Sequence, residues 1–299
     1  MADLTDIPGF ESFTEIKPIT KGWSEDKKYC VIKADGTKYL LRISPIERYE
    51  IRKSLFEMMK KVSALGIPMC KPVEFGVCPD GVYVLHNWIE GEDLSDVLPN
   101  LSETEQYELG LKAGEILQVI HSIPAPENQV NWAERVNRKI DTKMKKYQEC
   151  GIKIDGDDNF IKYIEQNRYL LENRPQCFQH DDYHVGNMML ENGELIIIDF
   201  DRSDYGDPWE EFKSITWNAQ LSASFATGQV NGYFEGEPPL EFFKLLAFYI
   251  SGGSLAHVLG AVTWGQHEID VALNLASNVL KWYDNMNNPV PTWYLRDFK

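Results

Sequence analysis

The chain has little of what marks secreted, zinc-binding and nucleic-acid-binding proteins. Its five cysteines are an odd number without a Cys-x-x-Cys pair, which argues against a disulfide framework and a structural zinc site. Basic residues number 30 against 46 acidic ones, so the formal net charge is −16. Nucleic acids and anionic membranes bind basic patches, and the sequence therefore predicts neither as a partner.

Targeting and membrane signals are also missing from the sequence. We find no apolar stretch near the length that crosses a bilayer, and Met1 to Asp6 lack the charged start and apolar middle of a signal peptide. We therefore expect a cytoplasmic protein with free thiols. Its 299 residues suffice for two lobes. The acidic charge would attract a cationic substrate, although solubility alone explains that charge equally well.

Two short segments carry the strongest chemical signal. Between Cys177 and Asn187 the chain reads His-x-Asp-x-x-x-x-Asn, with the aspartate at Asp182. This is the spacing of the kinase catalytic loop, in which the aspartate accepts the proton of the attacking hydroxyl and the asparagine binds Mg²⁺. Asp199 follows four apolar residues and stands where a second metal ligand is needed.

An Asn-Gly turn joins these two segments. Asn192-Gly193 lies between two apolar runs, a pattern that predicts a β-hairpin. The hairpin would bring Asn187 and Asp199 to the same site. Aspartate also favours ordinary turns, so neither segment alone indicates catalysis. Together, in this order and joined by a hairpin, they predict a phosphoryl-transfer centre.

The pattern of apolar residues changes along the chain. Strands are expected at 28–33, 38–43, 73–77 and 82–89, and a helix at about 47–65. From Ser102 onward, where Ser-x-x-Glu forms a capping-box signature, the period is mostly helical. We therefore expect an α+β bilobal fold. Its N-terminal nucleotide-binding lobe would span 1–90, and its helical lobe with the catalytic loop and the acceptor site would span 91–299.

The N-terminal lobe contains candidates for phosphate binding. A kinase needs a cation on a central strand against the non-transferred phosphates, and Arg42 occupies that place. Such a cation is normally paired with a glutamate on the following helix. Glu50 and Glu57 lie seven residues apart on nearly the same helical face, so either one fits this role.

Two connections would complete the nucleotide site. The loop 20–29 would cover the phosphates with its amides and the hydroxyl of Ser24, although its single glycine makes this a weak signal. The connection 86–91 would bind adenine through the backbone around Asn87 and Ile89.

These segments together resemble the aminoglycoside phosphotransferase and choline kinase family. The motifs that carry the resemblance are Leu40–Ile43, Gly66–Pro68, Lys71-Pro72, Trp88–Gly91, Ile120–Ile123, His180–Asn187 and Ile198–Phe200. The resemblance implies a bilobal protein-kinase-like fold with Mg²⁺, ATP or GTP, and a small hydroxyl-bearing acceptor. It makes Asp182 the catalytic base and Asn187 and Asp199 the metal ligands. It also makes Arg42 the phosphate-binding cation and His180 a buttress of the loop.

Some residues depart from the pattern. Leu55 stands about where the family's paired glutamate is expected, and Asp201 replaces the glycine of the kinase Asp-Phe-Gly motif. Asp201 would either assist the metal or form a turn or salt bridge. The resemblance gives Asp207 the role of anchoring its loop to a helix. No Ala-Pro-Glu segment closes an activation loop, which argues against a protein substrate.

Three functions remain open at this point. The first is a kinase that phosphorylates a small cationic molecule, an aminoglycoside antibiotic, on a hydroxyl. The second is a metabolic kinase for choline, ethanolamine, another amino alcohol or a sugar. The third is an inactive nucleotide-binding module, against which the intact set of Asp182, Asn187 and Asp199 argues.

Overall fold

The computed structural model describes residues 4, 6–20, 25–296 and 298 and divides the chain into two compact units. Unit 1 contains Met1–Leu94 and Asn187–Asp201, and unit 2 contains Ser95–Gly186 and Arg202–Lys299. The division differs from the expected lobes of 1–90 and 91–299, because the hairpin that begins at Asn187 belongs with the N-terminal sheet. Asp182 therefore lies in unit 2, whereas Asn187 and Asp199 lie in unit 1.

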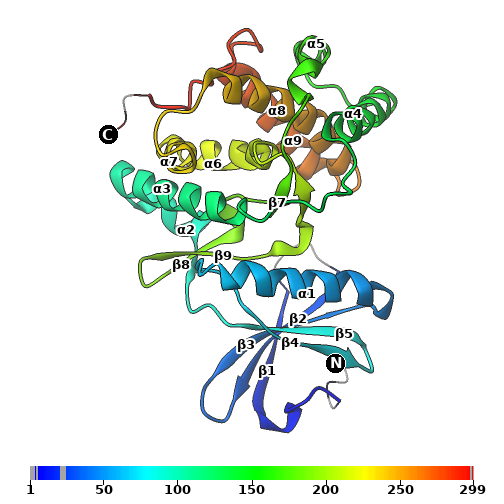
Figure 1. Cartoon of the computed structure of the whole chain (residues 1–299), viewed down its shortest axis with the longest axis vertical. Helices are drawn as coiled ribbons and strands as arrows, with labels where there is room; N and C mark the ends of the chain where they lie inside the picture. The colour runs from blue at the N-terminus through cyan, green and yellow to red at the C-terminus, as the bar shows by residue number, and fades with distance from the viewer. Residues whose placement is uncertain (1–3, 5, 21–24, 297, 299) are drawn as a thin grey trace. The chain divides into compact units, whose positions relative to one another are not determined.

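Unit 1 is built on an antiparallel five-stranded sheet in the order β1-β2-β3-β5-β4 (Figure 1). Its strands are β1 (Phe13–Ile19), β2 (Lys27–Lys33), β3 (Lys38–Ser44), β4 (Pro72–Cys78) and β5 (Gly81–Asn87). Among the described residues of this unit, the single long helix is α1 (Tyr49–Ala64), which ends before Gly66 in a left-handed conformation (φ 80°). These elements confirm the expected small sheet with one helix.

A second sheet in unit 1 carries the predicted hairpin. It consists of β6 (Glu92–Asp93), β8 (Met188–Glu191) and β9 (Glu194–Ile197) in the order β6-β8-β9. Asn192 and Gly193 both have positive φ, 52° and 83°, as a two-residue hairpin turn requires. The amide of Cys70 donates to the carbonyl of Ile197 at 3.0 Å, which ties β9 to the segment that precedes β4. The hairpin prediction is confirmed.

Unit 2 is mostly helical, as expected. Its helices are α2 (Leu94–Val97), which starts at the unit boundary, α3 (Glu103–Ile120), α4 (Trp132–Glu149), α5 (Asp157–Asn167), α6 (Ile215–Leu221), α7 (Ala223–Phe234), α8 (Leu240–Ala261) and α9 (Gln266–Trp282). The strands β7 (Cys177–Gln179) and β10 (Asp204–Gly206) form an antiparallel pair. The short 3-10 helices of unit 2 are η3 (Leu98–Asn100), η4 (Arg168–Leu171) and η7 (Glu210–Ser214). Those of unit 1 are η1 (Phe10–Ser12) and η2 (Ile46–Arg48), and η5 (Val185–Asn187) and η6 (Phe200–Arg202) cross the unit boundaries. The capping box of Ser102 and Glu105 is present at the start of α3.

Glycines allow α3 and α7 to approach closely. A Cβ atom at Gly114 of α3 would lie 2.2 Å from the carbonyl oxygen of Gln229, and one at Gly232 of α7 would lie 2.1 Å from that of Leu111. Helix α3 in turn accepts a hydrogen bond from the buried Tyr183 hydroxyl at its Ala113 carbonyl, 2.7 Å away. The Tyr183 bond thus ties the loop that carries Asp182 to α3, which is itself packed closely on α7.

Helix α8 corrects one expectation from the sequence. It is long and apolar enough to cross a membrane by length and composition, whereas we expected no such segment. Most of α8 is buried within the protein, and its Phe242, Leu246 and Val258 are completely covered. A buried core helix has the same composition, so this helix is weak evidence for a membrane span.

All five cysteines are free, as expected.

Candidate phosphoryl-transfer site

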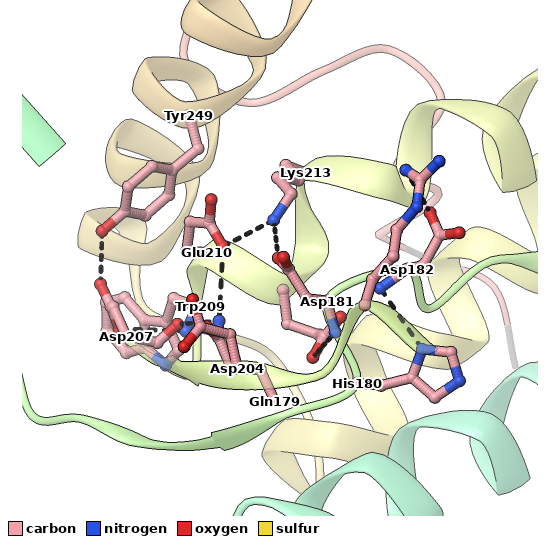
Figure 2. Close-up of polar contacts among 12 residues, drawn as sticks. Gln179, His180, Asp181, Asp182, Asp204, Asp207, Trp209, Glu210, Lys213 and Tyr249 are labelled. Carbon is pink, nitrogen blue, oxygen red and sulfur yellow. Dashed lines mark hydrogen bonds and ion pairs between the residues drawn. The ribbon is translucent and has the colours of Figure 1, made fainter. Parts of the chain in front are cut away.

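The loop that carries Asp182 is fixed by neighbouring segments of unit 2 (Figure 2). Asp181 has a left-handed backbone (φ 63°), a conformation that aspartate tolerates better than most residues with a Cβ. Its amide donates to the Glu211 carboxylate at 3.0 Å, and its carboxylate contacts the Lys213 ammonium. Further along the loop, the amide of Val185 donates to the Asn218 side chain at 2.9 Å. These contacts hold the backbone on both sides of Asp182.

Asp182 itself is surrounded by cationic and imidazole groups. Its Oδ1 lies 3.5 Å from His184 Nε2 and 3.6 Å from Arg202 Nη1. Burial would raise the pKa of Asp182, but His184 and Arg202 outweigh it and lower this pKa to about 2. The carboxylate is therefore ionised at neutral pH and available as a hydrogen-bond acceptor.

Two histidines contact Asp182, one at its backbone amide and one at its carboxylate. The amide of Asp182 donates to Nδ1 of the fully buried His180 at 3.3 Å, which fits the predicted role of His180 as a buttress. The amide of Gly186 donates to His184 Nδ1 at 3.0 Å, and this bond assigns the ring proton to Nε2, on the side of Asp182. The centroid of the His184 ring also lies 6.5 Å from that of the Trp217 ring, so an aromatic side chain adjoins the histidine that contacts Asp182.

Lys213 links the catalytic loop to η7. Its ammonium contacts Asp181 and lies 2.7 Å from Glu210 Oε2 (Figure 2). Burial opposes its charge, but Glu210 and Asp181 outweigh burial and raise the pKa of Lys213. Gln179 at the end of β7 adds a bond from its Nε2 to the Asp207 carbonyl at 2.8 Å. The carboxylates of Glu210 and Asp181 thus serve internal contacts.

Asp207 anchors its segment, as the sequence predicts. Its carboxylate accepts two bonds from Arg174, at 2.8 and 2.9 Å, and one from the Tyr249 hydroxyl of α8 at 2.7 Å. The amide of Trp209 adds a fourth bond at 3.0 Å. Asp207 is completely buried, and it joins the segment before η7 to the core helix α8.

The predicted metal ligands lie together in unit 1, at the two ends of the hairpin. The amide of Ile198 donates to the Asn187 carbonyl at 3.0 Å, which places the two strand ends side by side. Asp199 follows in a left-handed conformation (φ 62°), and its side chain is 47% exposed and hence accessible to a ligand. Carboxylate and amide oxygens suit Mg²⁺, which typically takes one or two protein ligands and completes its shell with phosphates and water. Asn187 and Asp199 therefore fit this ion.

No group of three or more His, Cys, Asp and Glu side chains gathers as a metal site in the described ranges.

Arg42 of β3 is the strand cation that the sequence predicts beside these ligands. Its Nη1 lies 3.4 Å from Asp199 Oδ1, and its Nε donates to Asp26 Oδ2 at 2.6 Å. Its Nη2 also contacts the Asp201 carboxylate. Burial opposes the charge, but Asp201 and Asp199 outweigh it and raise the pKa of Arg42. Asp201 thus forms salt bridges, which was one of its two expected roles.

The prediction that Glu50 or Glu57 pairs with Arg42 is wrong. Glu50 and Glu57 are both exposed on α1, and Glu57 pairs with Lys60 at 3.2 Å. The residue of α1 that reaches the sheet is Arg52, which is 2% exposed. Glu50 and Glu57 lie about 160° and 140° around the helix from Arg52, hence on the opposite face. Asp26 supplies the carboxylate instead.

The remaining predicted nucleotide-binding residues are Ser24, Asn87 and Ile89. Ser24 lies outside the described residues. Asn87 uses its amide and its side-chain oxygen to bind the Lys71 backbone, at 3.1 and 2.5 Å, and Ile89 is buried. These bonds fix the connection after β5, and its contact with adenine stays a prediction.

Comparison with known proteins identifies the family. The model of the phosphotransferase enzyme family, APH, matches residues 15–243. The match covers more than half of the chain, which therefore belongs to this family and is a small-molecule kinase. A comparison with curated proteins finds no match.

Solved structures show the same fold at low identity. The aminoglycoside phosphotransferase APH(4)-Ia, as a thermostable mutant with ADP and hygromycin B, is 17% identical with a TM-score of 0.66, over 92% of this chain and 96% of that one. The ADP-bound aminoglycoside phosphotransferase APH(2'')-Ib is 14% identical with a TM-score of 0.65, over 93% and 98%. An amicoumacin kinase with AMP-PNP, Ca²⁺ and its substrate is 15% identical with a TM-score of 0.63, over 97% and 96%. The predicted α+β kinase-like fold is confirmed.

Proposed function

We propose that this protein transfers the γ-phosphoryl group of ATP or GTP to a hydroxyl of a small cationic molecule. The observation that carries the proposal is the state of Asp182, an ionised carboxylate on a loop that is hydrogen-bonded on both sides. Asp182 would accept the hydrogen of the acceptor hydroxyl and orient its oxygen. Its low pKa suits orientation better than strong proton abstraction, and kinases of this type rely mainly on positioning and electrostatics.

Asn187 and Asp199 would hold Mg²⁺, which when bound neutralises charge on the outer phosphates. Arg42 would add a fixed positive charge for the phosphate oxygens. Each of the three side-chain nitrogens of Arg42 contacts a carboxylate. The contact of Nη1 with Asp199, at 3.4 Å, is the longest of the three. We assign this nitrogen to the nucleotide. The backbone around Asn87 and Ile89 would contact the base of the nucleotide.

We propose an aminoglycoside as the first acceptor to test. The net charge of −16 favours cations, the Trp217 ring beside His184 offers a surface for an amine or a sugar ring, and proteins of the same fold bind aminoglycosides. Such an enzyme would confer antibiotic resistance and act in the cytoplasm. A metabolic kinase for choline, ethanolamine, another amino alcohol or a sugar is the second candidate. The amicoumacin kinase is a reason to test acceptors beyond aminoglycosides.

Acceptor-stimulated nucleotide consumption tests the proposal. Purified protein with Mg²⁺ and either ATP or GTP is assayed against aminoglycosides, amicoumacin, choline, ethanolamine and simple sugars. Asp182→Asn serves as the control for contaminating activity. Stimulation by aminoglycosides alone supports the first candidate, and stimulation by a metabolite replaces it with the second. Absence of Mg²⁺-nucleotide binding by the wild-type protein would contradict the proposed function.

A further inference from the structure

Four charged side chains form a buried cluster in unit 1, which we call the arginine–aspartate cluster: Asp26, Arg42, Arg52 and Asp201. Asp26 is fully buried as a side chain, whereas Arg52 is 2% and Arg42 is 11% exposed. Asp201 is 22% exposed, so two positive and two negative charges meet largely, although not fully, away from water. Groups of this kind are retained only when every charge has partners, because an unpaired buried charge is costly.

The contacts alternate in sign around the cluster. Asp26 Oδ2 accepts from Arg42 Nε at 2.6 Å and also contacts Arg52 Nη2. Asp201 accepts from Arg52 Nη1 at 2.7 Å and contacts Arg42 Nη2. Each carboxylate thus bridges both guanidinium groups. The Ser44 hydroxyl accepts from Arg52 Nε at 2.8 Å and fixes the plane of that guanidinium.

Each member comes from a different part of the predicted nucleotide site. Asp26 immediately precedes β2, in the loop expected to cover the phosphates, and Arg42 is the strand cation. Arg52 comes from α1, and Asp201 follows the metal ligand Asp199 by two residues in η6. The cluster therefore connects the loop, the strand, the helix and the metal-binding segment within unit 1.

The charge on the helix is the reverse of the kinase pattern. In that pattern a helix glutamate fixes the strand cation, and here the helix presents an arginine toward the cation. Two guanidinium groups repel each other unless carboxylates separate them, and Asp26 and Asp201 occupy these intervening places. Asp201 is engaged by both arginines, which leaves Asp199 as the accessible carboxylate of this segment.

We propose that Asp26 and Arg52 are positioning residues that replace the helix glutamate. Asp26 sets the orientation of Arg42 toward the phosphates, and Arg52 holds Asp201 and through it the backbone that presents Asp199 to Mg²⁺. This inference rests on the proposed nucleotide-dependent function. It predicts that the affinity for Mg²⁺-nucleotide depends on buried residues that contact neither the metal nor the acceptor.

Calorimetric binding of Mg²⁺-ATP and Mg²⁺-GTP tests the inference. The variants are Asp26→Asn, Arg52→Met and Arg52→Lys, the last of which keeps the charge but loses the planar fork. We expect each to raise the dissociation constant about tenfold or more and to raise the Mg²⁺ concentration that half-saturates activity. The control is Glu15→Gln, which weakens an exposed pair with Lys17 at 2.5 Å on β1 and should leave both quantities unchanged.

The double variant Arg52→Met/Asp201→Asn separates positioning from general destabilisation. The single variant Asp201→Asn completes the cycle. Removing both charges leaves no carboxylate at Asp201 that has lost its Arg52 partner, so the double variant should bind nucleotide better than the sum of the effects of Arg52→Met and Asp201→Asn predicts. Thermal unfolding is followed in parallel, and affinities are compared only for folded samples. A merely structural role would lower the unfolding temperature and leave the dissociation constant of the folded protein unchanged.

The outcomes distinguish the inference from the function on which it rests. If the wild-type protein binds no Mg²⁺-nucleotide, the proposed function is wrong and the inference is overturned with it. If the wild-type protein binds and folded Asp26→Asn and Arg52→Lys bind equally well with the same Mg²⁺ requirement, only the inference is overturned. If Arg52→Met does not fold, Arg52→Lys still tests whether Arg52 affects nucleotide affinity.

Discussion

Substitution of Lys213 by methionine tests how Asp182, the proposed catalytic base, is held. The change removes an ammonium group that contacts Asp181 and lies 2.7 Å from Glu210, while a side chain of similar length remains. Asp181 then keeps a left-handed backbone next to the base with one fewer contact to hold it. The loss should therefore affect both the stability of unit 2 and the placement of Asp182.

The size of the effect follows from burial. Removing one partner of a fully buried ion pair costs about 3–5 kcal/mol, whereas exposed pairs contribute about 0–1 kcal/mol. The side chains of Lys213 and Asp181 are 23% and 25% exposed, and that of Glu210 is 11% exposed. We therefore expect a loss of about 2–3 kcal/mol in the free energy of unfolding. For a chain of 299 residues, this loss lowers the melting temperature by about 3–5 °C.

Kinetics should reveal a second effect. A displacement of the base by about 1 Å can lower the rate about 100-fold, so we expect kcat to fall at least about tenfold. Nucleotide affinity should change far less, because Arg42 and Asp199 belong to unit 1. The assays are differential scanning fluorimetry and steady-state kinetics with the acceptor that the panel identifies.

Matched variants make this prediction specific. Asp181→Asn tolerates the left-handed backbone but loses the charge, so it should also lower kcat. Lys112→Met breaks the exposed pair with Glu115 and should change neither quantity. A Lys213→Met protein with wild-type melting temperature and wild-type kcat would refute the reasoning.

Four further predictions concern the proposed base, its neighbour His184, the proposed metal ligand and the helix packing. Asp182→Asn should lower kcat about 100-fold or more with little change in nucleotide affinity, and normal turnover would remove Asp182 as the base. Because the pKa of Asp182 is lowered from its ordinary 3.8 to about 2, its stabilising contribution is present above about pH 4 and is lost as the pH falls toward 2. His184→Ala should therefore move the acidic limb of the kcat/KM profile to higher pH, and an unmoved limb would exclude this contribution of His184. Asp199→Ala should abolish Mg²⁺-dependent nucleotide binding in calorimetry, and an unchanged affinity would contradict its role as a metal ligand. Gly114→Ala should lower the unfolding free energy by about 3 kcal/mol or more in urea titrations, since the new Cβ would lie 2.2 Å from a backbone oxygen. Its control, Gly253→Ala, has nothing within 4 Å and should be neutral or stabilise by up to about 1 kcal/mol; equal effects at the two sites would contradict the packing argument.

Local sequence rules predict the hairpin and the helices of this fold well. The Asn192-Gly193 turn follows from the need for positive φ at both positions, and the capping box at Ser102 follows from the free amides at a helix start. These features depend on residues that are close in sequence. The boundary between the units is different, because the return of 187–201 to unit 1 depends on contacts such as that of Cys70 with Ile197. No local pattern encodes that pairing.

The partners of the strand cation could not be predicted for a related reason. The place of Arg42 in an apolar strand predicts that it is the strand cation. Its negatively charged partners are Asp26, Asp199 and Asp201, none of which lies on the helix that follows its strand. Charged residues are seldom buried, so Arg52 resembles any solvated helix arginine in the sequence. Only the spatial arrangement shows that α1 turns Arg52 toward the sheet and Glu50 and Glu57 toward solvent.

Transfer of a labelled γ-phosphoryl group is the most direct test of the central claim. Wild-type protein and Asp182→Asn are incubated with Mg²⁺, γ-labelled ATP or GTP, and each acceptor of the panel, and the products are separated. We predict that the label appears on a hydroxyl of a small cationic acceptor with wild-type protein and is nearly absent with Asp182→Asn. Equal labelling by the two proteins, or nucleotide binding without label on any small-molecule acceptor, would contradict the account.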